Sequence, residues 1–203
     1  MGMGRVSDAR ERLLKATLEL TWRESYGAVT VDAICERSGV KKGSFYYFFE
    51  SKSQLTAEAL KHHWETLRPM YDPIFSPSVP PLERFRRYFD FLYERHANLK
   101  AQAGRVLGCP FFSVGCEVTR HDPLIGEAVR AIIKSKTKYF ESALRDAQAE
   151  GLIHVTDIPA QAQALFAYVD GVLGQARIQN DLELIRTLPE GVRRFLALEP
   201  AAV

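Results

Sequence analysis

The chain has 203 residues, 46% of them hydrophobic, which is enough for a substantial core in one or two domains. No apolar stretch approaches the roughly 20 residues of a membrane span, and the N-terminal segment lacks the apolar region of a signal peptide. We therefore expect a cytoplasmic protein without a membrane partner. The net charge of +2 comes from residues 1–55, which hold 9 Lys/Arg and 7 Asp/Glu, and this favours a polyanionic partner.

The chain begins with a predicted amphipathic helix that ends before Gly27. Leu14, Leu18 and Trp22 repeat at helical spacing and give this helix an apolar face. Asp8 and Glu11 have the spacing of a capping box, which places the start of the helix near residue 8.

Residues 30–49 read as two short helices joined by a tight turn. Thr30 can cap the first helix through its hydroxyl, and Gly39 supplies the positive φ that a sharp turn between helices requires. Phe45 and Phe49 are four residues apart and share the buried face of the second helix. Such a pair of helices is the form of a DNA-reading unit.

The second short helix carries cations at its start and tyrosines on its outward side. The residues in positions to meet phosphates or base edges are Lys41, Lys42, Gly43, Ser44, Tyr46 and Tyr47. The next helix starts at Ser51 with Lys52 in its first turn, where a cation opposes the helix dipole and a nearby phosphate would explain it. On spacing alone, an ordinary helical turn followed by core aromatics stays an alternative.

The same run resembles the DNA-binding domain of the tetracycline-repressor family of bacterial transcriptional regulators. The matching residues are Gly27, Thr30, Val31, Ile34, Gly39, Val40, Lys42, Gly43, Ser44, Tyr46, Phe49, Lys52 and Leu55. The resemblance implies DNA contacts, mostly to phosphates, at Thr30, Lys41, Lys42, Gly43, Ser44, Tyr46, Tyr47 and Lys52. The sequence departs from the pattern at Cys35, Ser38 and Phe48, and no contact is carried over to Phe48.

The remainder reads as further helices, so we predict an all-α protein of about nine helices. Its expected domains are a three-helix helix-turn-helix head over residues 1–55 and a helical ligand-binding and dimerisation domain over residues 56–203. The expected helices cover about 51–70, 122–149, 157–179 and 182–198. One more helix is expected to begin at Pro81. Five of the ten prolines lie between Pro69 and Pro81, which predicts a connection there.

One stripe of the helix over 157–179 suggests an assembly surface. Ala167, Gly171, Gly174 and Ile178 share this stripe, and glycine within a helix is costly unless another backbone approaches. Packing within the chain stays an alternative. In the family that the head resembles, the last two helices form a four-helix dimer interface, which implies a homodimer through about 158–198.

The stretch 104–122 contains Cys109 and Cys116 and is the most distinctive part of the second domain. Buried thiols that pack as small hydrophobic groups are one interpretation. The other, implied by resemblance to the electrophile-sensing branch of the same family, is that Cys109 detects reactive compounds beside an inducer pocket. The candidate pocket residues are Trp64, Tyr71, Phe89, Tyr93, His96, Cys109, Phe112, Tyr139, Phe166 and Asp170.

No catalytic, metal or cofactor signature is present in the sequence. We predict a non-enzymatic transcriptional regulator, a repressor that binds a pseudo-palindromic double-stranded DNA operator as a homodimer and leaves it when a small-molecule inducer binds. The alternatives are an electrophile or redox sensor acting through Cys109, a DNA-binding module with no ligand, and a helical small-molecule-binding protein or enzyme with a vestigial head.

Overall fold

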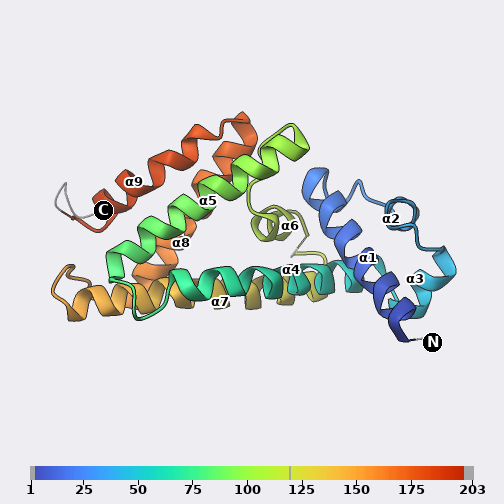
Figure 1. The fold of residues 1–203 in the computed structure, drawn as a ribbon, viewed down its shortest axis with the longest axis horizontal. Helices are drawn as coiled ribbons and strands as arrows, with labels where there is room; N and C mark the ends of the chain where they lie inside the picture. Colours follow the sequence, from blue (N-terminus) through green and yellow to red (C-terminus); the bar gives the residue numbers. More distant parts are fainter. Residues whose placement is uncertain (1–2, 119, 199–203) are drawn as a thin grey trace. The chain divides into compact units, whose positions relative to one another are not determined.

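The computed structural model describes residues 3–118 and 120–198, with side chains from Asp8 onward. Within these residues the chain is all helical, as predicted, and contains nine α-helices and one short 3-10 helix (Figure 1). The helices are α1 (Met3–Arg23), α2 (Val31–Ser38), α3 (Lys42–Phe48), α4 (Lys52–Ile74), α5 (Pro81–Ala103), α6 (Pro110–Val118), α7 (Pro123–Ala149), α8 (Ile158–Gln179), η1 (Glu183–Thr187) and α9 (Leu188–Phe195).

The helices form two compact units. Unit 1 comprises the described residues of Met1–Thr66 and Pro110–Ile132, and unit 2 comprises those of Leu67–Cys109 and Ile133–Val203. The packing therefore groups α6 and the start of α7 with the N-terminal helices. The predicted functional boundary between residues 55 and 56 stays a prediction, since it concerns what each part does.

In unit 1, α1, α2 and α3 surround a small apolar core. The Thr30 hydroxyl accepts a hydrogen bond from the Ala33 N–H at 3.1 Å and caps α2 as expected. Gly39 ends α2 with φ of 64°, which gives the predicted left-handed turn. Phe45 and Phe49 are fully buried beneath α3, so the outer face of this short helix is held in place by the core.

The predicted start of α1 was wrong. The helix already includes Met3, and Asp8 and Glu11 lie within it, where each carboxylate pairs with a cation four residues on, Arg12 and Lys15 respectively. Ion pairs at i,i+4 stabilise a helix interior. Asp8 and Glu11 also happen to have the three-residue spacing of a capping box, and for this reason they were mistaken for a helix start.

The prediction of an open connection from Pro69 was also wrong over its first part. Helix α4 continues to Ile74 with Pro69 and Pro73 inside it. Leu67, Tyr71 and Phe75 are buried at four-residue spacing, and this packing in unit 2 outweighs the lost backbone hydrogen bonds.

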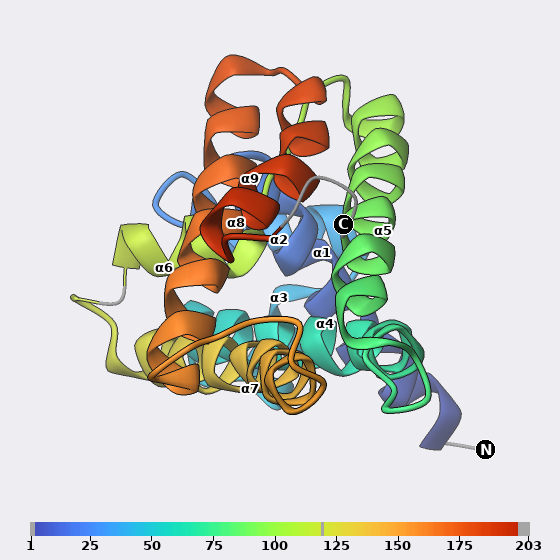
Figure 2. The ribbon, with the colours of Figure 1, turned by 90° about the vertical axis from the view of Figure 1, so that its left-hand side faces the viewer.

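Unit 2 is built from α5, α8, η1 and α9 together with the adjoining parts of α4 and α7. Helices α5 and α8 each contact η1 and α9, and Figure 2 shows α9 beside α8. Asp157 caps the start of α8 and Asn180 ends it in a left-handed conformation, in agreement with the expected helix over 157–179. The predicted last helix over 182–198 is instead the short η1 followed by α9, where Pro189 lies in the first turn.

No helix among the described residues is long and apolar enough to cross a membrane.

Candidate nucleic-acid interface and effector site

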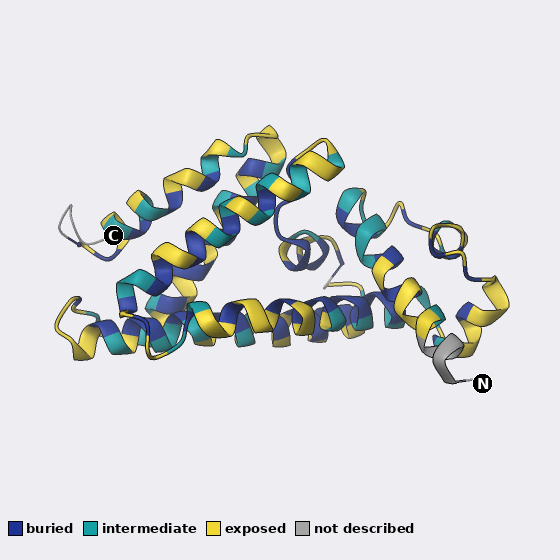
Figure 3. Cartoon of the chain, viewed as in Figure 1, coloured by how far each residue is buried: buried dark blue, intermediate teal, exposed yellow. Residues whose placement is uncertain are grey.

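Helix α3 presents the predicted DNA-contacting side chains to solvent (Figure 3). The exposed residues on it and at its N-cap are Lys41, Lys42, Gly43, Ser44, Tyr46 and Tyr47. Tyr46 is 57% exposed and Tyr47 is 76% exposed, which is unusual for large aromatic side chains unless they meet a partner. Phe45 on the opposite side of α3 and Phe49 at its C-cap are buried in the core, so the helix has one buried face and one open face.

Lys42 is exposed but not free. Its ammonium lies 2.7 Å from the Asp32 carboxylate on α2, and this pairing raises the pKa of Lys42. Asp32 is not one of the sequence-predicted residues, because its contact crosses the turn between the helices.

Thr30 and Lys52 are also engaged within the protein. The Thr30 hydroxyl caps α2, and the Lys52 ammonium donates to the backbone carbonyls of Tyr26 and Val29. Their predicted phosphate contacts stay predictions, and for Lys52 such a contact would compete with these hydrogen bonds.

The predicted pocket residues do not gather in one place. Trp64 is buried in unit 1, and Phe112, also in unit 1, is exposed. In unit 2, Tyr139 donates a hydrogen bond to Asp72, and burial, followed by this carboxylate, raises the pKa of Tyr139.

Five of the predicted residues lie in a buried region of unit 2 that we call the polar core cluster. Its members are Tyr71, Tyr88, His96, Cys109, Lys136, Phe166 and Asp170, all buried. The Lys136 ammonium is 4.0 Å from the Cys109 sulfur and 4.9 Å from the centre of the Phe166 ring. The Tyr71 and Tyr88 hydroxyls are 3.4 Å apart.

Sequence reasoning missed Lys136 and Tyr88. The signal for Lys136 was available, because it lies four residues from Ile132 and from Phe140 and therefore on the apolar stripe of α7. A lysine on such a stripe must snorkel outward or find partners in the core.

Burial shapes the charges of the polar core cluster. Burial acts against the Lys136 charge, but Cys109, Tyr71 and Asp170 raise the pKa of Lys136 above its ordinary value, so it stays protonated. Burial raises the pKa of Asp170, with Lys136 acting in the opposite direction, and burial lowers the pKa of His96. Asp170 Oδ1 and His96 Nε2 are buried without a hydrogen-bond partner among the described residues. A polar guest would satisfy these atoms.

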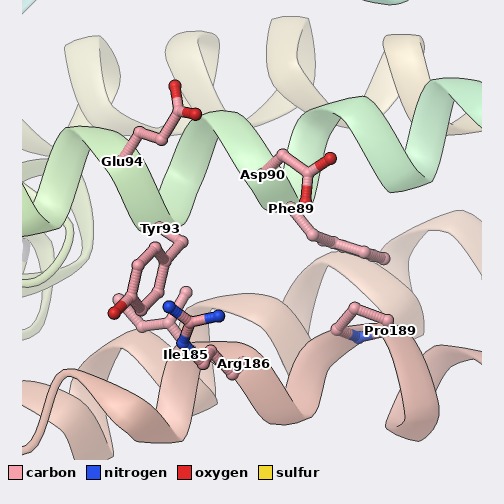
Figure 4. Close-up of a pocket in the computed structure, with 7 residues that line it drawn as sticks. All are labelled: Phe89, Asp90, Tyr93, Glu94, Ile185, Arg186 and Pro189. Carbon is pink, nitrogen blue, oxygen red and sulfur yellow. The ribbon is translucent and has the colours of Figure 1, made fainter.

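A separate surface groove of about 430 Å³ lies along α5 and η1 in unit 2 (Figure 4). Two of the predicted pocket residues, Phe89 and Tyr93, line it, together with Asp90, Glu94, Ile185, Arg186 and Pro189. The Arg186 guanidinium stands 3.9 Å from the centre of the Tyr93 ring, so a cation already covers the largest aromatic face of the groove.

The three cysteines are free thiols. Cys109 is buried, directly before α6, and the preceding Gly108 has a positive φ of 66°. Cys116 was expected to be buried within its helix, and this was wrong, because it lies on the exposed side of α6. Among the described residues no three His, Cys, Asp or Glu side chains gather as metal ligands.

The outward side of α8 carries almost no charge. Asp170 and Arg177 are the only charged residues of this helix, and Asp170 is buried. Ala167, Gly171 and Ile178 are exposed on the predicted stripe, with Ile178 77% exposed, and Gly174 is half-buried. A Cβ on Gly171 would meet no atom within 4 Å, so packing within the chain does not require glycine there.

Comparison with known proteins identifies two matching segments. Residues 13–59 match the family described as "Bacterial regulatory proteins, tetR family", and residues 81–190 match "Tetracyclin repressor-like, C-terminal domain". The HTH-type transcriptional repressor DhaR from Mycobacterium sp. strain GP1 is 25% identical over 176 residues, which is 86% of this chain and 85% of DhaR. The repressor NemR from Escherichia coli strain K12 is 22% identical over 94% of both chains. A crystal structure of a TetR regulatory protein from Rhodobacter sphaeroides aligns with a TM-score of 0.81 at 24% identity, covering 92% of this chain and 98% of that one.

Proposed function

Because this chain belongs to the tetracycline-repressor family of bacterial transcriptional regulators, we propose that it is a homodimeric repressor that a small-molecule inducer releases from a pseudo-palindromic operator. The observation that carries DNA reading is the open face of α3. Two lysines, a glycine, a serine and two tyrosines are exposed together on a helix whose other side is fixed by Phe45 and Phe49. Such a face can contact phosphates and base edges in a major groove.

The uncharged side of α8 supports a homodimer. A largely uncharged helix face of this kind can be covered by a second copy without burying an unpaired charge, and Gly171 would let the partner backbone approach closely. A twofold dimer presents two copies of α3, so its operator is expected to contain two inverted half-sites.

The polar core cluster supports an inducer site in unit 2. Asp170 Oδ1 and His96 Nε2 are buried without a hydrogen-bond partner among the described residues, which is costly unless something satisfies them. A small guest that bound there would favour one conformation of the regulator over the other, and release from DNA follows if that conformation binds the operator less well. As a DNA-binding regulator, the protein is expected to act in the cytoplasm and to catalyse no reaction.

The test is selection of operator sequences from a random double-stranded DNA library by the purified chain, with oligomeric state measured by analytical ultracentrifugation. We expect an enriched motif with two inverted half-sites, bound by a dimer. Failure to enrich any motif would contradict the proposal of sequence-specific binding, and a motif without symmetry would contradict the dimeric operator.

A second candidate, electrophile sensing through Cys109, is favoured by one contact. The Lys136 ammonium 4.0 Å from the thiol would stabilise a thiolate, which is the reactive form. If Cys109 senses electrophiles, N-ethylmaleimide should release the wild-type protein from the selected operator and leave the Cys109→Ser variant bound.

A further inference from the structure

The backbone of Tyr26 and Gly27, between α1 and α2, is held by a carboxylate from α6. Glu117 accepts the Tyr26 N–H on Oε2 at 2.9 Å and the Gly27 N–H on Oε1 at 2.7 Å. Two adjacent donors on one carboxylate are charge-assisted hydrogen bonds in a bidentate arrangement. A Cβ on Gly27 would lie 3.1 Å from Glu117 Oε1, so a larger residue here would require the carboxylate to shift by a few tenths of an ångström.

Lys52 holds the carbonyl side of the same segment. Its ammonium donates to the Tyr26 and Val29 carbonyls, each at 2.8 Å, and stands 4.0 Å from the centre of the Tyr26 ring. Two of its three N–H donors are used in this way. Burial lowers the pKa of Lys52, with Glu117 acting in the opposite direction.

The segment leads directly into the reading unit. Val29 is buried in the core beneath α2 and α3, and the next residue, Thr30, caps α2. Holding the backbone of residues 26–29 therefore fixes where α2 begins, and α3 packs against α2. If this segment shifted, α2 would shift with it and would displace α3 and its exposed side chains.

We propose that Glu117 and Lys52 are positioning residues that clamp the segment 26–29, and that Lys52 supports operator binding through this clamp and not through a phosphate. The inference rests on the DNA-binding function proposed above. Two of the three N–H donors of Lys52 are used by the carbonyls and its charge faces the Tyr26 ring, so at most one donor is left for a phosphate. The clamp also makes α6, which follows Cys109 in the chain, the element that holds the reading unit in register.

The dependence of operator affinity on salt separates a clamp from a phosphate contact. Each neutralised phosphate contributes about 0.9 to the slope of log K against log salt concentration. We expect Lys52→Gln to weaken binding roughly tenfold at every salt concentration with an unchanged slope. Lys42→Gln is the comparison, because its ammonium is on the exposed face of α3. A slope that falls by about 0.9 in Lys52→Gln would overturn the proposal.

Hydrogen exchange tests the clamp without DNA. Glu117→Gln should raise amide exchange at Tyr26 and Gly27 on the order of tenfold, because glutamine replaces one of the two accepting oxygens with an NH₂ donor and removes the negative charge. Glu127→Gln, at an exposed position on α7, is the matched control and should leave these amides unchanged. Unchanged exchange in Glu117→Gln would overturn the clamp.

A double-mutant cycle completes the test. The double variant carries both Lys52→Gln and Glu117→Gln. If both residues act on one segment, its operator affinity should be at most about threefold below that of the single variant with the lower affinity. Fully additive losses would contradict a shared role. Failure of the wild-type protein to bind any selected DNA would contradict the proposed function instead, while the exchange measurement would still decide whether the clamp exists.

Discussion

The ammonium of Lys42, on the exposed face of α3, lies 2.7 Å from the Asp32 carboxylate of α2. The same cation is the predicted phosphate contact at the start of the reading helix. Both partners are largely exposed, so this ion pair is weak in water and can be exchanged for a phosphate at small cost. If Lys42 contacts a phosphate as predicted, Asp32 would compete with DNA for this cation.

Replacing Asp32 with asparagine should strengthen operator binding, because it frees Lys42 and removes a negative charge facing DNA. We expect a gain of roughly threefold at low salt that shrinks as salt rises. Fluorescence anisotropy across a salt series measures it. Glu36→Asn, at another exposed acid of α2, is the control. Equal gains in affinity from both variants would mean that loss of negative charge near the DNA is responsible, and not release of Lys42.

Replacing Gly171 with leucine should shift the protein toward monomer. The side chain would enter the space on α8 where we place the partner helix, and overpacking of an interface is destabilising by roughly 1–3 kcal/mol. Sedimentation velocity at micromolar concentration gives the answer. Ala101→Leu, at an exposed site on α5, should behave as wild type, and a fully dimeric Gly171→Leu would place the interface elsewhere.

Thiol labelling should distinguish the two cysteines of the 104–122 stretch. Because Cys116 is exposed and Cys109 is buried, a maleimide should modify Cys116 first by an order of magnitude or more. Mass spectrometry of the peptides measures both rates. Faster labelling of Cys109 would show that its surroundings open readily, which would favour the sensor interpretation.

Arg84 should be important for the stability of unit 2. Its side chain is 2% exposed and donates to Asp146 at 2.5 Å and to the Val79 carbonyl at 2.8 Å. Arg84→Met leaves these acceptors unpaired, but Asp146 is 39% exposed and can be hydrated, so we expect a loss of about 2 kcal/mol. Urea unfolding followed by circular dichroism tests this. Arg87→Met, which removes an exposed partner of Glu83, should cost no more than about 0.5 kcal/mol.

Tyr26 should titrate later than an ordinary tyrosine. Burial, and then the Asp122 carboxylate near its hydroxyl, raise the pKa of Tyr26 to about 12. Because the folded pKa lies above the unfolded value, the stabilisation is complete below pH 10 and is lost as pH rises through 12. In ultraviolet titrations, the wild-type protein should show one more tyrosine ionising near pH 12 than Tyr26→Phe does. A difference centred near pH 10 would contradict this environment.

Local signals predicted the helices well, because a cap or a turn depends on neighbouring residues. Thr30 and Gly39 act where the sequence indicated, and α8 covers nearly the expected range of 157–179. The candidate DNA face was predictable for the same reason, since buried and exposed positions alternate with helical period around Phe45.

Contacts between distant segments were not predictable from these patterns. Glu117 reaches Tyr26 and Gly27 across 91 and 90 positions of sequence, and Asp122 accepts from Ser53 across 69. The predicted pocket residues do not lie together. The sequence pattern of an aromatic residue at helical spacing is the same whether its side chain packs in the core, lines a groove or faces solvent. Burial of Lys136 likewise depends on which helices surround α7.

Pro69 and Pro73 give α4 a preferred direction of bending. They are four residues apart and both exposed, so they lie on the same, solvent-facing side of the helix. Each removes one backbone hydrogen bond and presses its ring against the preceding turn, which tilts the helix away from the proline. The two tilts add because the prolines share a side, whereas prolines on opposite sides would cancel. The prolines therefore favour bending of α4 in one direction, in which the side toward water would be convex and the side that carries Tyr71 would be concave.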